Sequence, residues 1–281
     1  MRVVGGEKAN AEDWPFIAVF YETKLGWDSR FCGGSLLNEN WVITAAHCFM
    51  DPYSKKVYNH KRCVLIIGIR SCLLGENYLL RYSVSFGIFE RSDFPGEARK
   101  LKQVVCHPDF RATYREIQND ICLIRVSQPV PLADRIKPVC IATALPTESE
   151  YCKIAGVGQT MGTVSDENLN QAALPVANFR ECAQDYSAFG IRLNEQQHLC
   201  AGFSHGGVDA CQGDSGGPFV CKGNQLTGVV SFGIGCATAE TYGIYTSMPN
   251  YIDWITDVVG CPIGYTGPNC EDDLDECEVG G

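Results

Sequence analysis

The sequence has no long uninterrupted hydrophobic run and no closely spaced cysteine pair. Its longest apolar stretch, CVLIIGIRSCLL at 63–74, is broken by Arg70 and is too short to span a bilayer. The start, MRVVGGEKAN, lacks the apolar segment of a signal peptide. None of the 16 cysteines belongs to a C-x-x-C pair, which argues against a zinc-binding protein. Positive charge is also scarce, and a formal net charge of -10 argues against a nucleic-acid partner.

Cysteine, in contrast, is abundant. Sixteen cysteines in 281 residues indicate an oxidising compartment and several disulfides, so we expect a secreted, extracellular protein. Secretion without a leader suggests that the chain is a fragment of a longer precursor or a partial gene model. The length allows one large all-β domain or two modest ones.

Short β-rich runs recur between turn signals, which is typical of an all-β barrel or sandwich rather than of βαβ units. The runs lie at 14–22, 41–48, 82–90, 120–126, 225–233 and 242–248. A single helix is predicted at 249–260, because Ile252, Ile255 and Val259 recur at helical spacing. A proline at its start and a glycine at its end support these bounds.

Three reactive side chains stand in distinctive settings: His47 in VITAAHC, Asp120 in NDICLI and Ser215 in GDSGG. A serine hydroxyl is a poor nucleophile until a base takes its proton, and an acid can orient that base. Glycines beside the serine free backbone amides to stabilise an oxyanion. Taken singly, a histidine beside a cysteine is more often structural, and an aspartate that opens a strand is usually a turn or cap residue. Their joint presence in one cysteine-rich chain favours a catalytic constellation.

The sequence resembles the chymotrypsin/trypsin-like serine protease family over roughly residues 3–259. The matching stretches are VVGGEKA, WPFIAVF, CGGSLLNENWVITAAHC, HPDF, NDICLIRV, PVCIA, CQGDSGGPFVC, SFGIGCA and YGIYT. The resemblance implies two six-stranded antiparallel β-barrels with a C-terminal helix, and peptide-bond hydrolysis through an acyl-enzyme. It implies that His47 is the general base, Asp120 orients it and Ser215 attacks the substrate. The amides of Gly213 and Ser215 would form the oxyanion hole.

The resemblance also implies the substrate preference. Asp209 matches the floor of the family's primary specificity pocket, where a buried carboxylate favours a lysine or arginine side chain. Gly233 and Gly243 match the pocket walls, and small residues there leave room for a long side chain. The backbone from Ser231 to Gly233 is expected to pair with the substrate as an antiparallel strand. We favour arginine over lysine, and an apolar pocket is the weaker alternative.

Activation is expected to follow the family pattern. There, cleavage frees an α-amino group that pairs with an aspartate at the position of Asp214 and orders the oxyanion hole. The motif RVVGG places this cleavage between Arg2 and Val3, so the chain as written resembles a zymogen. Residues 1–2 would be the remnant of a propeptide. Protein or peptide substrates and protein inhibitors are the expected partners.

The resemblance further implies a set of disulfides. The implied pairs are Cys32–Cys48, Cys152–Cys221, Cys182–Cys200 and Cys211–Cys236. Cys140 matches the family cysteine that joins the protease to an upstream propeptide or chain. Cys106 and Cys122 lie on consecutive predicted strands and could face each other across a hairpin, but the sequence leaves this pair open.

The segment 57–80 departs from the family pattern by about 20 extra residues. It contains Cys63 and Cys72, and it is either an enlarged loop over the active-site cleft or a gene-model artefact. Ile88 stands where the family's calcium loop has its first glutamate, so no metal is expected in the protease domain. Tyr242 occupies a position that is aromatic in some sodium-binding relatives.

Residues 261–281 differ in composition from the rest. CPIGYTGPNC resembles the closing half of an EGF-like module, bounded by Cys261 and Cys270, and DLDEC resembles the start of a calcium-binding one. Asp273, Asp275 and Glu276 are therefore calcium candidates in a full-length protein, and Cys277 has no evident partner. The expected organisation is a propeptide remnant at 1–2, a protease domain at 3–260 and a partial EGF-like segment at 261–281.

The sequence therefore predicts a secreted trypsin-like endopeptidase that needs no cofactor for catalysis. Two alternatives remain open. One is a non-catalytic binding or adhesion module that keeps the protease fold, and the other is an inert zymogen fragment distorted by the 57–80 insertion.

Overall fold

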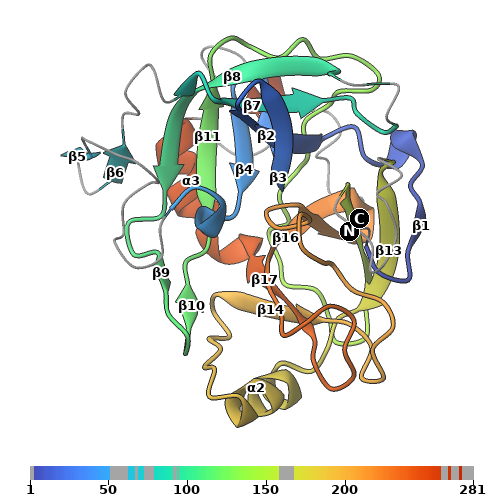
Figure 1. The fold of residues 1–281 in the computed structure, drawn as a ribbon. Coiled ribbons are helices and arrows are strands. Elements are labelled where there is room, and N and C mark those ends of the chain that lie inside the picture. Colours follow the sequence, from blue (N-terminus) through green and yellow to red (C-terminus); the bar gives the residue numbers. More distant parts are fainter. Residues whose placement is uncertain are drawn as a thin grey trace.

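The computed structural model describes residues 3–50, 79–90, 93, 95–157 and 168–260, together with the backbone of four further short strands. Two antiparallel sheets account for most of the described chain. In Figure 1 the sheet from the first half of the chain lies above the sheet from the second half.

Six strands of the first half close into a barrel. They are β2 (Ile17–Lys24), β3 (Trp27–Asn38), β4 (Trp41–Thr44), β7 (Tyr82–Phe86), β8 (Glu97–Cys106) and β11 (Cys122–Val126). The order runs β11-β4-β3-β2-β7-β8, and β8 pairs back onto β11, which closes the ring. On β8, Leu101 is buried between exposed Lys100 and Lys102, because side chains alternate between the two faces of a strand. This barrel confirms the first half of the predicted architecture.

Six strands of the second half form the other barrel. They are β12 (Tyr151–Gly156), β13 (Asn170–Pro175), β14 (His198–Ala201), β15 (Pro218–Cys221), β16 (Gln225–Phe232) and β17 (Gly243–Ser247). The order is β13-β12-β15-β16-β17-β14, and a bridge between Val176 and Ala201 joins its two ends. A short strand, β1 (Glu7–Lys8), pairs with the outer side of β13. The prediction of two six-stranded barrels is therefore confirmed.

The other strands form small additions to the barrels. They are β5 (Cys63–Ile66), β6 (Ile69–Cys72), β9 (Arg111–Ala112), β10 (Ile117–Gln118), β18 (Tyr265–Thr266) and β19 (Asp272–Asp273). The β5–β6 hairpin aligns Cys63 opposite Cys72 and pairs with β8 through β6. Of the rest of the 57–80 insertion only residues 79 and 80 are described: Leu79 is buried and Leu80 is exposed. Of the predicted EGF-like segment, including the Cys261–Cys270 pair, only the backbone of β18 and β19 is described.

The predicted C-terminal helix is present as α3 (Ile252–Val259), preceded by the 3-10 turn η5 (Met248–Tyr251). It ends at Gly260, which has a φ of 80° that suits glycine. Its buried Ile255 belongs to the same hydrophobic cluster as the first-barrel strands, so the helix that follows the second barrel packs on the first. Three more 3-10 turns are η1 (Ala11–Asp13), η2 (Ala46–Cys48) and η4 (Lys222–Asn224).

The helix α2 (Phe179–Ala188) was not predicted. A capping signal precedes it in the sequence: the Asn178 side chain accepts a hydrogen bond from the Glu181 amide at 3.2 Å. An asparagine followed three residues later by a glutamate is typical of a helix start. Only Cys182 and Tyr186 of this helix are buried, so its apolar stripe is too narrow for the periodicity to be evident.

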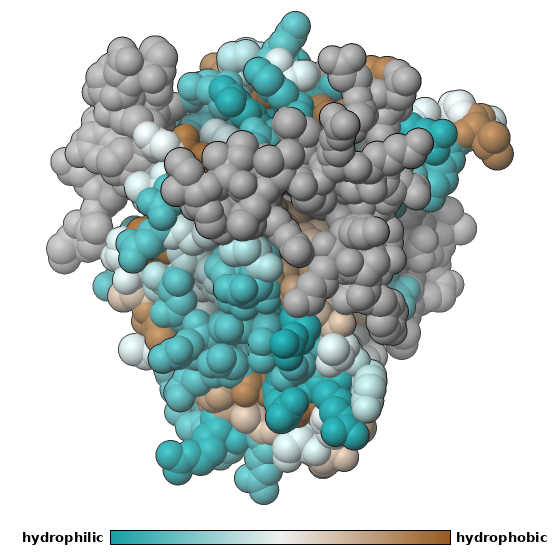
Figure 2. Space-filling view, turned by 90° about the vertical axis from the view of Figure 1, so that its left-hand side faces the viewer, coloured by the Kyte–Doolittle hydropathy of each residue, from teal (hydrophilic) through white to brown (hydrophobic). Residues whose placement is uncertain are grey.

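On the face drawn in Figure 2, the described surface is largely hydrophilic. In the lower part of Figure 2, hydrophobic residues are scattered among hydrophilic ones and form no single broad patch. Among the described residues, no helix is long and apolar enough to cross a membrane.

Candidate active site

The loop that carries Ser215 lies directly against the first barrel. The Gly33 amide on β3 donates a hydrogen bond to the Ser215 carbonyl at 2.8 Å. Gly216 has a φ of 79°, and a Cβ there would lie 2.1 Å from the Thr44 hydroxyl and 2.6 Å from the Gly33 carbonyl. The approach is also close at Gly33, where a Cβ would lie 3.1 Å from the Gly217 Cα. Gly216 on the serine loop and Gly33 on β3 therefore allow the close approach of the two barrels.

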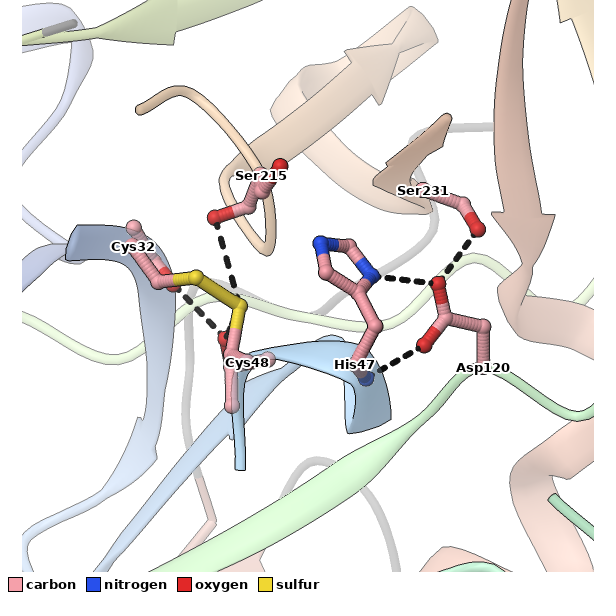
Figure 3. The surroundings of a disulfide bond; sticks show 8 residues. Cys32, His47, Cys48, Asp120, Ser215 and Ser231 are labelled. Carbon is pink, nitrogen blue, oxygen red and sulfur yellow. Dashed lines mark hydrogen bonds and ion pairs between the residues drawn. A yellow bond between two sulfur atoms is a disulfide. The ribbon is translucent and has the colours of Figure 1, made fainter. Parts of the chain in front are cut away.

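His47 and Asp120 lie next to the ends of two neighbouring strands of the first barrel and contact each other. His47 lies on η2, which follows β4, and Asp120 lies just before β11. The two residues make two contacts: the His47 amide donates to Asp120 Oδ1 at 2.8 Å, and His47 Nδ1 lies 2.8 Å from Asp120 Oδ2. From the second barrel, Ser231 Oγ donates to the same Oδ2 atom. Figure 3 shows these contacts, and Asp120 itself is 1% exposed.

The electrostatics of this pair favour the charged forms. Burial disfavours a charged imidazole, but the charge and hydrogen bond of Asp120 outweigh it and raise the pKa of His47 above 6.5. Burial likewise disfavours the Asp120 carboxylate, yet its contacts with His47 and Ser231 hold its pKa below the ordinary value. Asp120 is therefore ionised near neutral pH and can stabilise a protonated His47.

Ser215 lies beside the free edge of the His47 ring. In Figure 3 the ring nitrogen that does not contact Asp120 is on the side of the imidazole facing the Ser215 loop. No hydrogen bond joins the Ser215 hydroxyl to this nitrogen in the site drawn there. Such contacts are often long in a protein without substrate, so the arrangement is compatible with proton transfer after a small movement.

The backbone around Ser215 is shaped to present amide groups. Gly213 has a φ of 94°, a conformation that favours glycine. The amide of Asp214 donates to the Cys211 carbonyl at 2.9 Å, and that of Gly216 donates to the Val230 carbonyl at 2.8 Å. The amide of Gly213 directly precedes the engaged amide of Asp214 in the chain, and the amide of Ser215 lies between those of Asp214 and Gly216. This alternation fits the predicted oxyanion site.

The predicted pocket floor, Asp209, is a buried carboxylate with unused hydrogen-bonding capacity. It is 6% exposed, and its Oδ2 accepts from the Ala237 amide at 3.2 Å, whereas its buried Oδ1 has no partner among the described residues. Burial raises its pKa to about 6. A Cβ on Gly243 would lie 2.7 Å from Oδ1, whereas one on Gly233 would meet nothing closer than 3.8 Å. Gly243 is thus needed for access to the carboxylate.

The predicted activation residues also lie near this carboxylate. Val3 is 1% exposed in the hydrophobic cluster of the second barrel, and Val4 pairs with Asp209 through reciprocal backbone hydrogen bonds of 2.8 and 3.2 Å. Asp214 is 1% exposed, and its Oδ2 accepts from the Cys211 amide at 3.0 Å. Arg2 lies outside the described residues. Val3 is therefore buried next to the loop that carries Asp209, and its pairing with Asp214 after cleavage stays a prediction.

The disulfides follow the expectation with one exception. The four pairs implied by the resemblance are all formed: Cys32–Cys48, Cys152–Cys221, Cys182–Cys200 and Cys211–Cys236. The open pair is formed as well, because Cys106 and Cys122 are directly opposite on β8 and β11. The prediction for Cys140 is wrong. It is disulfide-bonded within this chain, to a cysteine outside the described residues, and so cannot also bind an upstream chain.

Several residues that support Asp120 were missed at the level of sequence. Thr246 Oγ1 donates to the Asp120 carbonyl at 2.9 Å. The preceding Asn119 has a φ of 51°; its amide donates to Gln197 Oε1 at 3.2 Å, and its Oδ1 accepts from the Tyr251 hydroxyl at 3.1 Å. Asparagine tolerates positive φ, so Asn119 could have been suspected from its type. Its partners are 78 and 132 residues away, beyond any local pattern.

The loop near Ile88 contains two described carboxylates that are already engaged, Glu90 with Lys8 and Asp93 with Arg135. Asp93 accepts from the amides of Phe89 and Glu90 at 2.9 and 3.0 Å, and it pairs with Arg135 at 3.0 Å. Ile88 itself is 3% exposed and packs in the first-barrel core. The Asp93 carboxylate is therefore neutralised by an arginine of the protein itself.

Comparisons with known proteins agree with the fold. The family model described as Trypsin matches residues 3–67 and 70–255. The chain is 33% identical over 259 residues to Trypsin-2 of Salmo salar, covering 92% of this chain and 95% of that protein. It is 32% identical over 260 residues to Serine protease 1 of Rattus norvegicus, covering 92% and 90%. It is 33% identical over 260 residues to Trypsin-3 of Homo sapiens, covering 92% and 73%. The chain therefore belongs to the trypsin family of serine proteases.

Proposed function

We propose that this protein is a secreted serine endopeptidase that cleaves peptide bonds after arginine or lysine through an acyl-enzyme intermediate. The observation that carries the proposal is the His47 imidazole, held by Asp120 on one nitrogen and turned toward Ser215 with the other. The histidine, the aspartate and the serine are all present, and each comes from a different part of the chain.

The chemistry assigned to these residues is acyl transfer. His47 takes the proton of the Ser215 hydroxyl as the oxygen attacks the scissile carbonyl, and it then gives that proton to the leaving amine. Asp120 fixes the tautomer of His47 and stabilises its protonated form. The amides of Gly213 and Ser215 stabilise the oxyanion. A water molecule, activated by His47, hydrolyses the acyl-enzyme, and no cofactor is required.

Asp209 supports the proposed preference for a basic side chain. Its Oδ1 is buried and has no hydrogen-bond partner among the described residues, and a guanidinium or ammonium group would supply both the hydrogen bond and the opposite charge. A buried unpaired acceptor costs about 1–3 kcal/mol, which a matching substrate recovers on binding. The planar, two-pronged guanidinium suits a carboxylate better than an ammonium does, so arginine is the preferred side chain.

We also propose that the enzyme is made as a zymogen activated by cleavage between Arg2 and Val3. Val3 is buried and the next residue, Val4, pairs with Asp209, so cleavage would free an amino group beside the loop that also carries Asp214. Extracellular function is supported by the disulfides, since such bonds persist mainly in oxidising compartments. The tail beyond residue 260 is proposed to begin an EGF-like region, with calcium bound only in a longer protein.

The test uses protein refolded with its disulfides and cleaved after Arg2. Amide substrates ending in Arg, Lys and Phe are assayed alongside the Ser215→Ala variant. Turnover of the Arg and Lys substrates that disappears in the variant is the expected result. Cleavage of the Phe substrate alone would contradict the role of Asp209. No turnover by folded, cleaved protein would favour the non-catalytic binding module.

A further inference from the structure

A buried histidine of the second barrel has no role in the proposed reaction. His198 begins β14 and is 2% exposed. It is directly opposite Thr246 in the β14–β17 pairing, so the two side chains project from the same face of the sheet. Thr246 already donates to the Asp120 carbonyl. His198 is therefore next to the segment that carries the proposed catalytic aspartate.

The tautomer of His198 follows from its contacts. The Asn194 amide donates a hydrogen bond to His198 Nδ1 at 3.0 Å, so Nδ1 must hold a lone pair and the ring proton must lie on Nε2. The Nε2 atom is buried and has no hydrogen bond of normal geometry among the described residues. The backbone of Ile117 is the group that interacts with the ring at this point. A buried N–H donor is thus directed toward the Ile117 carbonyl.

The surroundings of the ring oppose its protonation. Phe232 on β16 contacts it edge to face, with ring centroids 5.8 Å apart. Burial lowers the pKa of His198 to about 4, although the Ile117 backbone and the charge of Asp120 act in the opposite direction. Asp120 is the charged group that acts on the ring. Protonation would also turn Nδ1 into a donor facing the Asn194 amide and break that hydrogen bond.

The neighbour of His198 contacts the same segment. Gln197 Oε1 accepts from the Asn119 amide at 3.2 Å, and the Gln197 carbonyl accepts from the Ser247 amide at 2.9 Å. Two consecutive side chains of the second barrel therefore support residues 117–120 of the first. The segment has few other constraints from its own strand, because β10 is only two residues long and pairs with the equally short β9.

We propose that His198 is a positioning residue that holds the Ile117–Asp120 segment in place through a neutral imidazole whose Nε2 proton faces the Ile117 carbonyl. The inference rests on the proposed function in so far as the position of Asp120 controls catalysis by His47. Loss of the donor would let Asp120 shift relative to His47. The chemical step would then slow, while the pocket around Asp209 would be unchanged.

The activity test compares two substitutions of similar size. His198→Met fills the space but removes the donor, and it is expected to lower kcat about tenfold, equivalent to about 1.4 kcal/mol, with KM changed less than about twofold. His198→Gln keeps an N–H near the position of Nε2 and should recover kcat to within about threefold of the parent protein. Gln196→Ala, an exposed change in the same turn, is the matched control and should leave kcat unchanged. Equal losses in the Met and Gln variants would overturn the donor role.

A second measurement does not depend on activity, and its first part uses only the parent protein. Nitrogen NMR of His198 in the parent protein at pH 7 reports its tautomer, and the proposal requires a neutral ring with the proton on Nε2. A protonated ring, or a proton on Nδ1, would overturn it. If the parent protein cleaves no substrate but shows the required tautomer, the proposed function fails. In that case the NMR signal of the proton between His47 and Asp120 tests the positioning role. This signal should shift in His198→Met and not in His198→Gln. An unchanged signal in both variants overturns the positioning role.

Discussion

Replacing Asp209 by asparagine should make the unliganded protein more stable at alkaline pH while it disables cleavage after arginine. The carboxylate is 6% exposed, and its Oδ1 has no partner among the described residues. Burial of this charge is costly, and no salt bridge between described residues involves the carboxylate. Asparagine keeps the side chain shape and one oxygen acceptor for the Ala237 amide, but it carries no charge.

The magnitude follows from the pKa of this group. Burial raises the pKa of Asp209 from 3.8 to about 6. A shift of about two units corresponds to roughly 3 kcal/mol, because each unit is worth about 1.4 kcal/mol. Since the folded value lies above the unfolded one, the contribution to stability is fully present below pH 3.8 and is lost as the pH rises through about 6. The variant lacks this loss of stability. Its free energy of unfolding should therefore exceed that of the parent by about 1–3 kcal/mol at pH 8 and by little at pH 4.

Denaturant unfolding with the disulfides intact measures this difference. Both proteins carry Ser215→Ala, which prevents self-cleavage, and Asp134→Asn on the exposed surface controls for the change in net charge. An equal stability difference at pH 4 and pH 8 would refute the reasoning, as would a variant less stable than its parent at pH 8. In the active background, kcat/KM for an Arg substrate should fall at least about 100-fold, because one partner of a buried charge pair is lost.

Three further results are expected. Activity should rise with pH through a pKa above 6.5, because Asp120 raises the pKa of His47 and only the neutral ring accepts a proton; a rate profile with its acid limb below pH 6.5 would contradict this. Ser231→Ala removes a donor to Asp120 and should lower kcat about tenfold in steady-state kinetics with little effect on KM; an unchanged kcat would exclude this contact from catalysis. Gly216→Ala should abolish activity and cost at least about 2 kcal/mol in the free energy of unfolding, because its Cβ would lie 2.1 Å from a hydroxyl of the first barrel. Gly223→Ala has a similar φ of 72° but open space, so it should cost only about 1 kcal/mol and spare activity.

The predicted helix and the missed helix differ in how strongly their sequences mark a buried face. In α3 the apolar residues recur at helical spacing, and the buried Ile255 packs on the first barrel. In α2 the stripe is narrow, and the Asn178 cap is the clearer signal. Hydrophobic periodicity reports burial, so a helix that lies mostly at the surface is marked mainly by its ends.

The sequence also left some of the disulfides undetermined. The Cys106–Cys122 pair was left open, and it forms because β8 and β11 pair in the register that brings the two residues opposite each other. Cys140 was assigned to a separate chain and is instead bonded within this one. Connectivity depends on which Cα atoms approach within about 7 Å, and that distance is a property of the folded chain.

The sequence by itself determined an all-β architecture, the residue types of the site and the glycines of the serine loop, because these follow from local patterns. The two-barrel arrangement was implied by the resemblance to the serine protease family. Gly216, for example, follows Ser215 directly, and any side chain there would collide with β3 and β4. Only the tertiary structure decided which distant groups support Asp120: Ser231, Thr246 and Gln197 reach it or its neighbour from 78 to 126 residues away. The tertiary structure also decided that Asp209 is buried with its Oδ1 unpaired among the described residues, and which tautomer His198 adopts. Burial and hydrogen bonding depend on what the folded chain brings into contact, and that is decided when the two barrels pack together.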